Sequence, residues 1–341
     1  MRIAALDLGT NSFHLLVVDA HADGTFMPLA KEKEMLRLGD AVAREGRVPD
    51  ADARRAVDTV ARFRTLAESA GSDEIVAYAT SAIREADNGG ELVDRIREEA
   101  GVEVQVITGA EEARLIFDAI RASIVIEPPP ALAFDLGGGS LEVMVGDRGG
   151  LRWGASVKLG VARLTAELVR GDPPSTGDIR RLRERYTAGL APLADEVARL
   201  HPGMSVGTSG TLCTLARMIA ARRTGTVPVS VNHLTFERTE LQALHKDMLA
   251  VPASARSRLA GLDSGRADII PTGSLFLLTA MELFGFEALT VGEWALREGI
   301  VLDAIGHHDA ADWSGDPRAI RRASVLELAR RCNWDEVHSR Q

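Results

Sequence analysis

Two turns in the sequence combine glycines, hydrogen-bond donors and neighbouring acids in a way that suits phosphate chemistry. Residues 135–142 read DLGGGSLE, and residues 7–12 read DLGTNS. Glycines let an anion approach several backbone N–H groups at once, and the side chains of Asn11, Ser12 and Ser140 add donors. One such turn alone is equally compatible with an ordinary tight hairpin. Because the pattern occurs twice, the sequence favours two facing turns that hold a chain of phosphates between them.

Two carboxylates flank the second turn and are candidates for binding a metal ion. Asp135 precedes the glycines and Glu142 follows them, so the two side chains lie across the mouth of the expected hairpin. Magnesium prefers hard oxygen ligands together with water and substrate phosphate. The pair therefore predicts a Mg²⁺ site, with Mn²⁺ as the alternative ion. A tight hairpin with an exposed glutamate is the competing interpretation.

A basic residue follows a short expected strand that ends in Thr-Ser, within the stretch ATSAIREADNG at residues 79–89. Free N–H groups at the start of the next helix favour anions. Arg84 lies about one turn into that helix, where its guanidinium can bind a phosphate with two donors. An arginine on the surface of an ordinary helix would give the same pattern.

The stretch TGAEEARLIFDAI, residues 108–120, predicts a helix that opens with two glutamates. Glu111 shares a face with Arg114 and is expected in solvent, and its distance from Thr108 fits a capping box. Glu112 shares the apolar face of Leu115. An inward carboxylate is either paired with a cation or acts as a general base with a raised pKa. Compensation of the helix dipole remains a third interpretation.

A third small-residue turn, GTSGT at residues 207–211, lies between an expected strand and an expected helix. By itself it is a weak signal, with Ser209 as a phosphate-binding candidate. The histidines show no metal-ligand spacing, and His14 lies on a strand. Neither a Walker A motif nor a GxSxG motif occurs in the sequence.

Apolar patterning predicts that an α/β framework positions these residues. A hairpin of strands 2–8 and 13–19 opens the chain, and its residues match a second hairpin that restarts at Ala131, as in Asp7 and Asp135. The other expected elements include a strand over 27–38 and helices over 50–69, 176–200, 234–249, 271–284 and 295–305.

Internal duplication predicts two α/β domains with a cleft between them. Three consecutive prolines, at positions 128–130, mark the boundary. We assign residues 1–127 to the first domain and 128–305 to the second, whose last helix is expected to pack back on the first. Residues 306–341 read as a helical tail that resembles the beginning of a further helical module.

Composition excludes several classes of protein. The chain has 341 residues and a net charge of −9, which argues against a surface that wraps DNA. The sequence contains no run of about 18 apolar residues, so no membrane span is expected. The start of the chain lacks the features of a signal peptide. Two cysteines far apart in the sequence suit a reducing compartment, so we expect a cytoplasmic protein.

Taken together, the motifs resemble one known family. The stretches DLGTNSFHLLVVD, ATSAIREADNG, GAEEARLIF, AFDLGGGSLEVMVG, GTSGT and WALREGI, in this order, are similar to the exopolyphosphatase/guanosine pentaphosphate phosphohydrolase family. That family belongs to the superfamily of acetate and sugar kinases, heat-shock-70 proteins and actin. The resemblance covers about residues 2 to 305. It implies two duplicated actin-like (ribonuclease H-like) domains that close on a phosphoanhydride substrate, with Mg²⁺.

The resemblance also assigns roles to individual residues. Its catalytic glutamate falls on Glu112, and its metal-associated acids fall on Asp135 and Glu142. Long family members carry an HD-like helical module that aids dimerisation; here the tail matches only the start of that module, and a homodimer is compatible with the resemblance. The phosphate-binding positions of the family match Thr10, Asn11, Ser12, Arg84, Gly137, Gly138, Gly139 and Ser140, and more weakly Arg266 in GRADIIPTG.

The expected function is Mg²⁺-dependent hydrolysis of a terminal phosphoanhydride in inorganic polyphosphate or guanosine pentaphosphate, with no DNA or membrane as partner. Two alternatives remain open at this point. A kinase or ATPase of the same superfamily would need a purine pocket near residues 207–211. A non-catalytic sensor of polyphosphate or of a guanosine alarmone would bind the same anions without turning them over.

Overall fold

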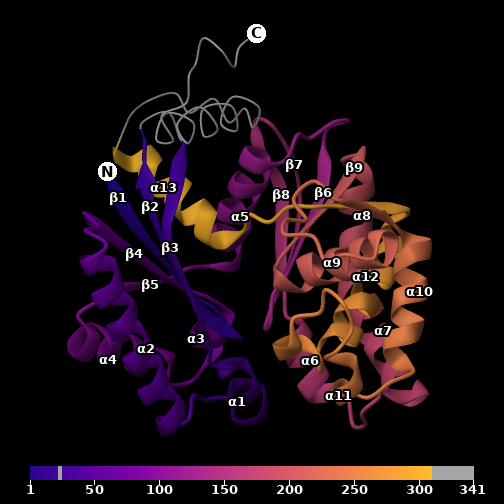
Figure 1. Ribbon diagram of the computed structural model, residues 1–341, viewed down its shortest axis with the longest axis horizontal. Coiled ribbons are helices and arrows are strands. Elements are labelled where there is room, and N and C mark those ends of the chain that lie inside the picture. Colours follow the sequence, from indigo (N-terminus) through magenta and orange to yellow (C-terminus); the bar gives the residue numbers. More distant parts are fainter. Residues whose placement is uncertain (22–24, 309–341) are drawn as a thin grey trace.

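Two mixed β-sheets with matching strand order form the framework (Figure 1). This computed structural model describes residues 1–21 and 25–308. The first sheet contains β1 (Arg2–Leu8), β2 (Ser12–Ala20), β3 (Phe26–Met35), β4 (Glu74–Ala79) and β5 (Val104–Val106). The second contains β6 (Ala131–Leu136), β7 (Leu141–Asp147), β8 (Gly150–Val157), β9 (Met204–Thr208), β10 (Thr235–Glu237) and β11 (Ala288–Val291).

The strand order confirms that the fold is duplicated. The first sheet runs β3-β2-β1-β4-β5, and the second runs β8-β7-β6-β9-β11 with β10 added at its edge. In both sheets the first three strands are antiparallel neighbours. β4 and β5 in the first sheet, and β9 and β11 in the second, then join in parallel, whereas β10 pairs antiparallel with β11. The hairpin β1–β2 therefore occupies in one half the place that the hairpin β6–β7 occupies in the other.

Helices cover the faces of both sheets, which is why the central strands read as nearly continuous apolar runs. The helices of the first half are α1 (Leu38–Glu45), α2 (Asp50–Ser69), α3 (Ser81–Glu85), α4 (Gly89–Arg95) and α5 (Gly109–Ser123). Those that follow are α6 (Val161–Leu168), α7 (Thr176–Leu190), α8 (Ala194–Arg199), α9 (Gly210–Thr224), α10 (Arg238–Leu249), α11 (Ala253–Arg256), α12 (Ile270–Phe284) and α13 (Leu296–His308). All six residues of β6 are buried as a result.

Two helices, α5 and α13, join the halves. One apolar cluster combines residues of both helices with residues from both sheets, among them Ile3, Ile116, Ala133 and Ile300. α13 comes last in the described chain, yet it contacts β1, β2 and α5, and Figure 1 shows it lying back beside the strands of the first half. Residues from both ends of the chain therefore meet at one place.

Several element boundaries differ from the sequence prediction. The helix expected over 176–200 is wrong in its middle, because a short 3₁₀ turn containing Pro192 separates α7 from α8. The strand expected over 27–38 ends at Met35, and α1 starts at Leu38. β10 occupies the first residues of the helix expected over 234–249. Much of the expected tail, from residue 309 onward, lies outside the described residues.

Candidate active site

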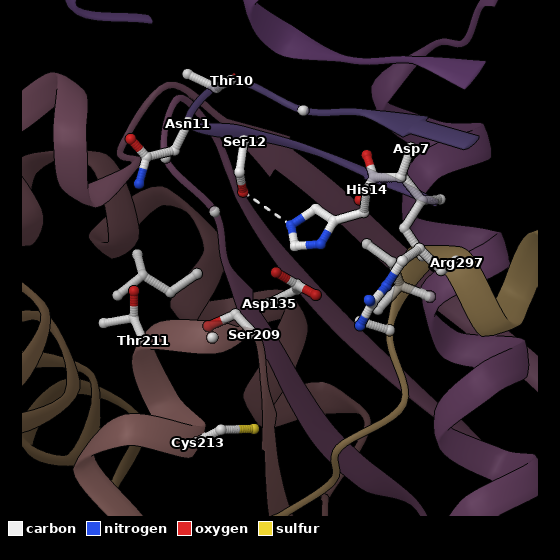
Figure 2. A pocket seen from close by; sticks show the side chains of 18 of the residues that line it. Asp7, Thr10, Asn11, Ser12, His14, Asp135, Ser209, Thr211, Cys213 and Arg297 are labelled. Carbon is white, nitrogen blue, oxygen red and sulfur yellow. Dashed lines mark hydrogen bonds between the residues drawn. The ribbon is translucent and has the colours of Figure 1, made fainter. Parts of the chain in front are cut away.

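A cavity of about 590 Å³ lies where the two halves meet. The turns after β1 and β6 line it, together with the start of α9 and the segment that leads into α13. Figure 2 shows side chains from these elements pointing into a common space. The ends of strands from two duplicated sheets thus converge on one site, as is usual for ligand sites in α/β folds.

The two glycine- and donor-rich turns face each other at close range. A Cβ atom on Gly138 would lie 3.0 Å from Cβ of Asn11, and one on Gly139 would lie 2.7 Å from Oγ1 of Thr10. The same Cβ on Gly139 would lie 2.6 Å from Oγ of Ser81. Only residues without a Cβ permit this approach, so the prediction of facing turns is confirmed and the run of glycines has a steric reason.

Matching pairs of residues stand next to these turns in the two hairpins. Asp135 lies opposite Glu142 in the register of β6 and β7, and Asp7 lies opposite His14 in the register of β1 and β2. All four residues line the cavity. Because residues directly opposite each other in an antiparallel pair share a face of the sheet, each hairpin presents two polar side chains to the same space.

Burial makes the charged forms of these acids costly. It raises the pKa of Asp7 to about 6 and that of Asp135 to about 7, the latter also through the charges of Glu112 and Asp7. Burial and then the charge of Asp135 raise the pKa of Glu142, against hydrogen bonds from Ser156 and Ser140. Four carboxyl groups with raised pKa values, Glu112 being the fourth, surround one cavity.

Glu112 projects from the first turn of α5 and is only 6% exposed, which confirms the prediction that it lies on the inward face of the helix. Burial and then the charge of Glu142 raise its pKa, while the guanidinium of Arg84 lowers it. Nη1 of Arg84 lies 3.1 Å from Oε2 of Glu112. Glu111 instead accepts hydrogen bonds from N and Oγ1 of Thr108 in a capping box, so adjacent glutamates have different surroundings.

The donor set suits Mg²⁺ bound jointly with a phosphate. Within residues 1–21 and 25–308, no three His, Cys, Asp or Glu side chains gather closely enough to hold a metal ion. Mg²⁺ in phosphate-transfer sites commonly uses one or two carboxylates and takes its other ligands from water and substrate. Asp135 and Glu142 provide such a pair, and a cation beside them would offset the cost of burying their charged forms, which is the main cause of their raised pKa values. Mg²⁺ or Mn²⁺ therefore fits the residues present.

Cationic side chains also line the cavity. Lys33, Arg266 and Arg297 line it, and their charges, after burial, hold the pKa of His14 well below its ordinary value. Nε2 of His14 lies 2.8 Å from Oγ of Ser12, a hydrogen bond drawn in Figure 2. The neutral ring thus fixes the hydroxyl of a turn residue without adding negative charge.

Most of the residues predicted from the sequence come together here. Arg84 is an exception, because its Nη1 donates to the carbonyl of Ile107 and to Glu112, and it does not line the cavity. Gly139 packs under the facing turn rather than lining the cavity. The predicted residues that do line it are Thr10, Asn11, Ser12, Glu112, Asp135, Gly137, Gly138, Ser140, Glu142, Ser209 and Arg266.

Sequence reasoning assigned no role in the site to four residues that line the cavity, Asp7, His14, Lys33 and Arg297. The repeat contained a signal for two of them, because it aligns Asp7 with Asp135 and His14 with Glu142. The other two are brought in by β3 and α13. Their place depends on how these elements pack, which no local pattern reveals.

Comparisons with known proteins show the family to which this chain belongs. The sequence model of the Ppx/GppA phosphatase family matches residues 17–308. Exopolyphosphatase 1 of Mycobacterium tuberculosis is 37% identical over 304 residues, covering 89% of this chain and 88% of that protein. A guanosine-5'-triphosphate,3'-diphosphate pyrophosphatase of Vibrio atlanticus is 26% identical over 338 residues, covering 99% of this chain and 65% of that protein.

The fold agrees as well. The crystal structure of an exopolyphosphatase from Cytophaga hutchinsonii matches with a TM-score of 0.83 at 29% identity, covering 90% of this chain and 98% of that one. The two duplicated halves are therefore actin-like α/β units. No helix within the two described ranges is long and apolar enough to cross a membrane. The family match, the close relatives and the shared fold agree that this chain is a hydrolase and belongs to the Ppx/GppA phosphatase family.

Proposed function

We propose that this chain removes the terminal phosphate of inorganic polyphosphate by Mg²⁺-dependent hydrolysis. The observation that carries the proposal is Glu112, a buried carboxylate with a raised pKa beside a cavity lined by two donor-rich turns. A general base works best when its pKa lies near the operating pH. Relatives named as exopolyphosphatases align along most of the chain, which supports polyphosphate as the substrate.

Substrate phosphates would lie between the two turns. Backbone N–H groups of residues 137–140 and the side chains of Asn11 and Ser12 supply donors to the phosphate oxygens, with no Cβ atoms in the way at the glycines. His14 orients the hydroxyl of Ser12 through their hydrogen bond. Positioning of this kind is the main contribution a protein makes to phosphoryl transfer.

The chemical step needs a water molecule and a base. Water attacks the terminal phosphorus in line with the bridging oxygen, the bond from phosphorus to that oxygen breaks, and a carboxylate oxygen of Glu112 takes the proton from the water. The products are inorganic phosphate and a chain one phosphate shorter. Arg84 holds Glu112 in position, and its positive charge favours the ionised carboxylate against the effect of burial. Bound near Asp135 and Glu142, Mg²⁺ would offset the negative charge of the phosphates.

Guanosine pentaphosphate is the second candidate substrate. The Vibrio atlanticus relative, named for a reaction on this nucleotide, aligns along 99% of the chain. Both compounds present a terminal phosphoanhydride to the same turns. The test compares phosphate release from tripolyphosphate, long polyphosphate and guanosine pentaphosphate, with Mg²⁺ and with a chelator. Release from none of the three substrates in the presence of Mg²⁺ would refute the proposal, as would Mg²⁺-independent release.

A further inference from the structure

Arg297 has a position in the cavity that its place in the sequence does not reveal. It lies in the first turn of α13, a helix from the end of the described chain that packs on β1 and β2. Figure 2 shows its guanidinium near His14 and Asp7, facing the space beside Asp135. Its side chain is 23% exposed, and it lines the cavity. A residue of the last helix thus contributes to the acidic end of the site.

The guanidinium of Arg297 makes only one weak contact with the described residues. Its one ion pair is with Oε1 of the adjacent Glu298, at 3.8 Å, and it makes no hydrogen bond to any described residue. Oε2 of Glu298 accepts a hydrogen bond from N of Ala295, so this glutamate caps the helix. Within the described part of the chain, the five N–H donors of this planar group therefore have no hydrogen-bond acceptor.

Two of the other arginines near the site have closer partners, whereas Arg217, which also lines the cavity, has only an ion pair with Glu293 at 3.8 Å. Arg84 donates to Glu112 and to the carbonyl of Ile107. Arg266 shares the carboxylate of Asp263 with Lys33, at 3.5 Å in both cases. Phosphate is recognised best by a guanidinium that presents two parallel donors, and a cavity lined by acids needs a cation to admit a polyanion.

We infer that Arg297 binds the terminal phosphoryl group of the substrate, opposite the Asp135–Glu142 pair. This inference rests on the proposed function and adds a substrate-contacting residue to it. The phosphoryl oxygens would replace water on the free donors of the guanidinium. Because charge-assisted hydrogen bonds gain strength in a desolvated site, the contact would stabilise the transferring group in the transition state as well as in the bound substrate.

The test separates binding from turnover. Arg297→Met removes the charge and keeps an unbranched side chain, whereas Arg297→Lys keeps the charge and loses the two parallel N–H donors of the guanidinium. Arg114→Met is the matched control. Arg114 of α5 forms an ion pair with Asp303 of α13 at 2.9 Å, and it lies outside the cavity. Hydrolysis of tripolyphosphate is measured in each variant. Calorimetric binding of tripolyphosphate, with Mg²⁺, is measured with the same changes in a Glu112→Gln background.

We expect Arg297→Met to weaken tripolyphosphate binding and lower kcat/KM by about 10- to 150-fold, the range for a hydrogen bond to a charged group. Arg297→Lys should lie between Arg297→Met and the parent, and Arg114→Met should stay within about threefold. Arg297 variants within threefold of the parent in both assays would overturn the inference while leaving the proposed function intact. Equal losses in Arg297→Met and Arg114→Met would also overturn it, because docking of α13 would explain them. An unsubstituted chain that releases no phosphate from any substrate would refute the proposed function, and the inference with it.

Discussion

Replacing Asp135 with asparagine should stabilise the metal-free protein while it removes activity. Asp135 is buried, and its pKa is raised from 3.8 to about 7, first by burial and then by the charges of Glu112 and Asp7. At a pH above 7 the folded protein must carry this charge in a site that disfavours it. Asparagine has the same shape without the charge, so the variant avoids that cost.

The size and sign of the change in the free energy of unfolding follow from the raised pKa of Asp135. A rise of roughly three pKa units corresponds to about 4 kcal/mol, which is the ceiling for the gain in free energy of unfolding. Below about pH 4 the acid is protonated in both states, so the variant gains nothing. Between about pH 4 and pH 7 the unfolded chain releases the proton and the folded one keeps it. The stability of the parent falls as the pH rises through this window, and the advantage of Asp135→Asn grows to its full size.

Thermal unfolding in a chelator at pH 4.5, 6 and 8 measures this effect. We expect Asp135→Asn to raise Tm by up to about 6 °C at pH 8 and by little at pH 4.5. Added Mg²⁺ should stabilise the parent more than the variant. Asp147→Asn is the control, because Asp147 at the other end of β7 pairs with Arg152 and should gain no stability. A Tm difference that is negative at pH 8, or equal at all three pH values, would refute the electrostatic argument.

Four further substitutions test other parts of the site. Glu112→Gln should lower turnover in a phosphate-release assay by about 10²- to 10⁴-fold, the usual effect of losing a general base. Glu111→Gln should stay within a few-fold of the parent. A larger loss in Glu111→Gln would show that Glu112 is not the base. Arg84→Gln removes the cation that lowers the pKa of Glu112, so the acid limb of the kcat–pH profile should move to higher pH. A rise in KM at every pH would instead make Arg84 a phosphate ligand. Glu142→Gln should raise the Mg²⁺ concentration needed for half-maximal activity, and an unchanged metal titration would contradict its role. Gly139→Ala places a methyl group 2.6 to 2.7 Å from two hydroxyl oxygens. We expect kcat/KM to fall while Tm changes little. Normal kinetics would show that the two turns need not touch.

Features set by short-range physics could be predicted from the sequence. The capping box of Thr108 and Glu111 and the inward direction of Glu112 follow from helical periodicity, and both are present in α5. The pairing of Asp135 with Glu142 follows from a short loop between two apolar strands, which leaves little freedom of register. Each of these inferences needed only a few neighbouring residues.

Features set by packing could not be predicted in the same way. Nothing local to Arg84 indicates that its guanidinium reaches the first turn of α5, so its pairing with Glu112 was not anticipated. Arg297 is a comparable case, because its place depends on α13 returning to the first half. The break between α7 and α8 differs from these. Pro192 is a local signal for it, but the helical periodicity over 176–200 led to the prediction of one continuous helix.

The duplication also explains why the two sides of the cavity differ in charge. Equivalent positions in the two hairpins hold the pair Asp135 and Glu142 in one half and the pair Asp7 and His14 in the other. A glutamate in place of His14 would add a fifth buried carboxylate beside the four already present. The neutral histidine avoids this, and the cation of Arg297 enters on the same side. The acidic pair of the second half suits a metal ion, whereas His14 at the equivalent position of the first half orients the hydroxyl of Ser12, so these positions have different tasks in the proposed reaction.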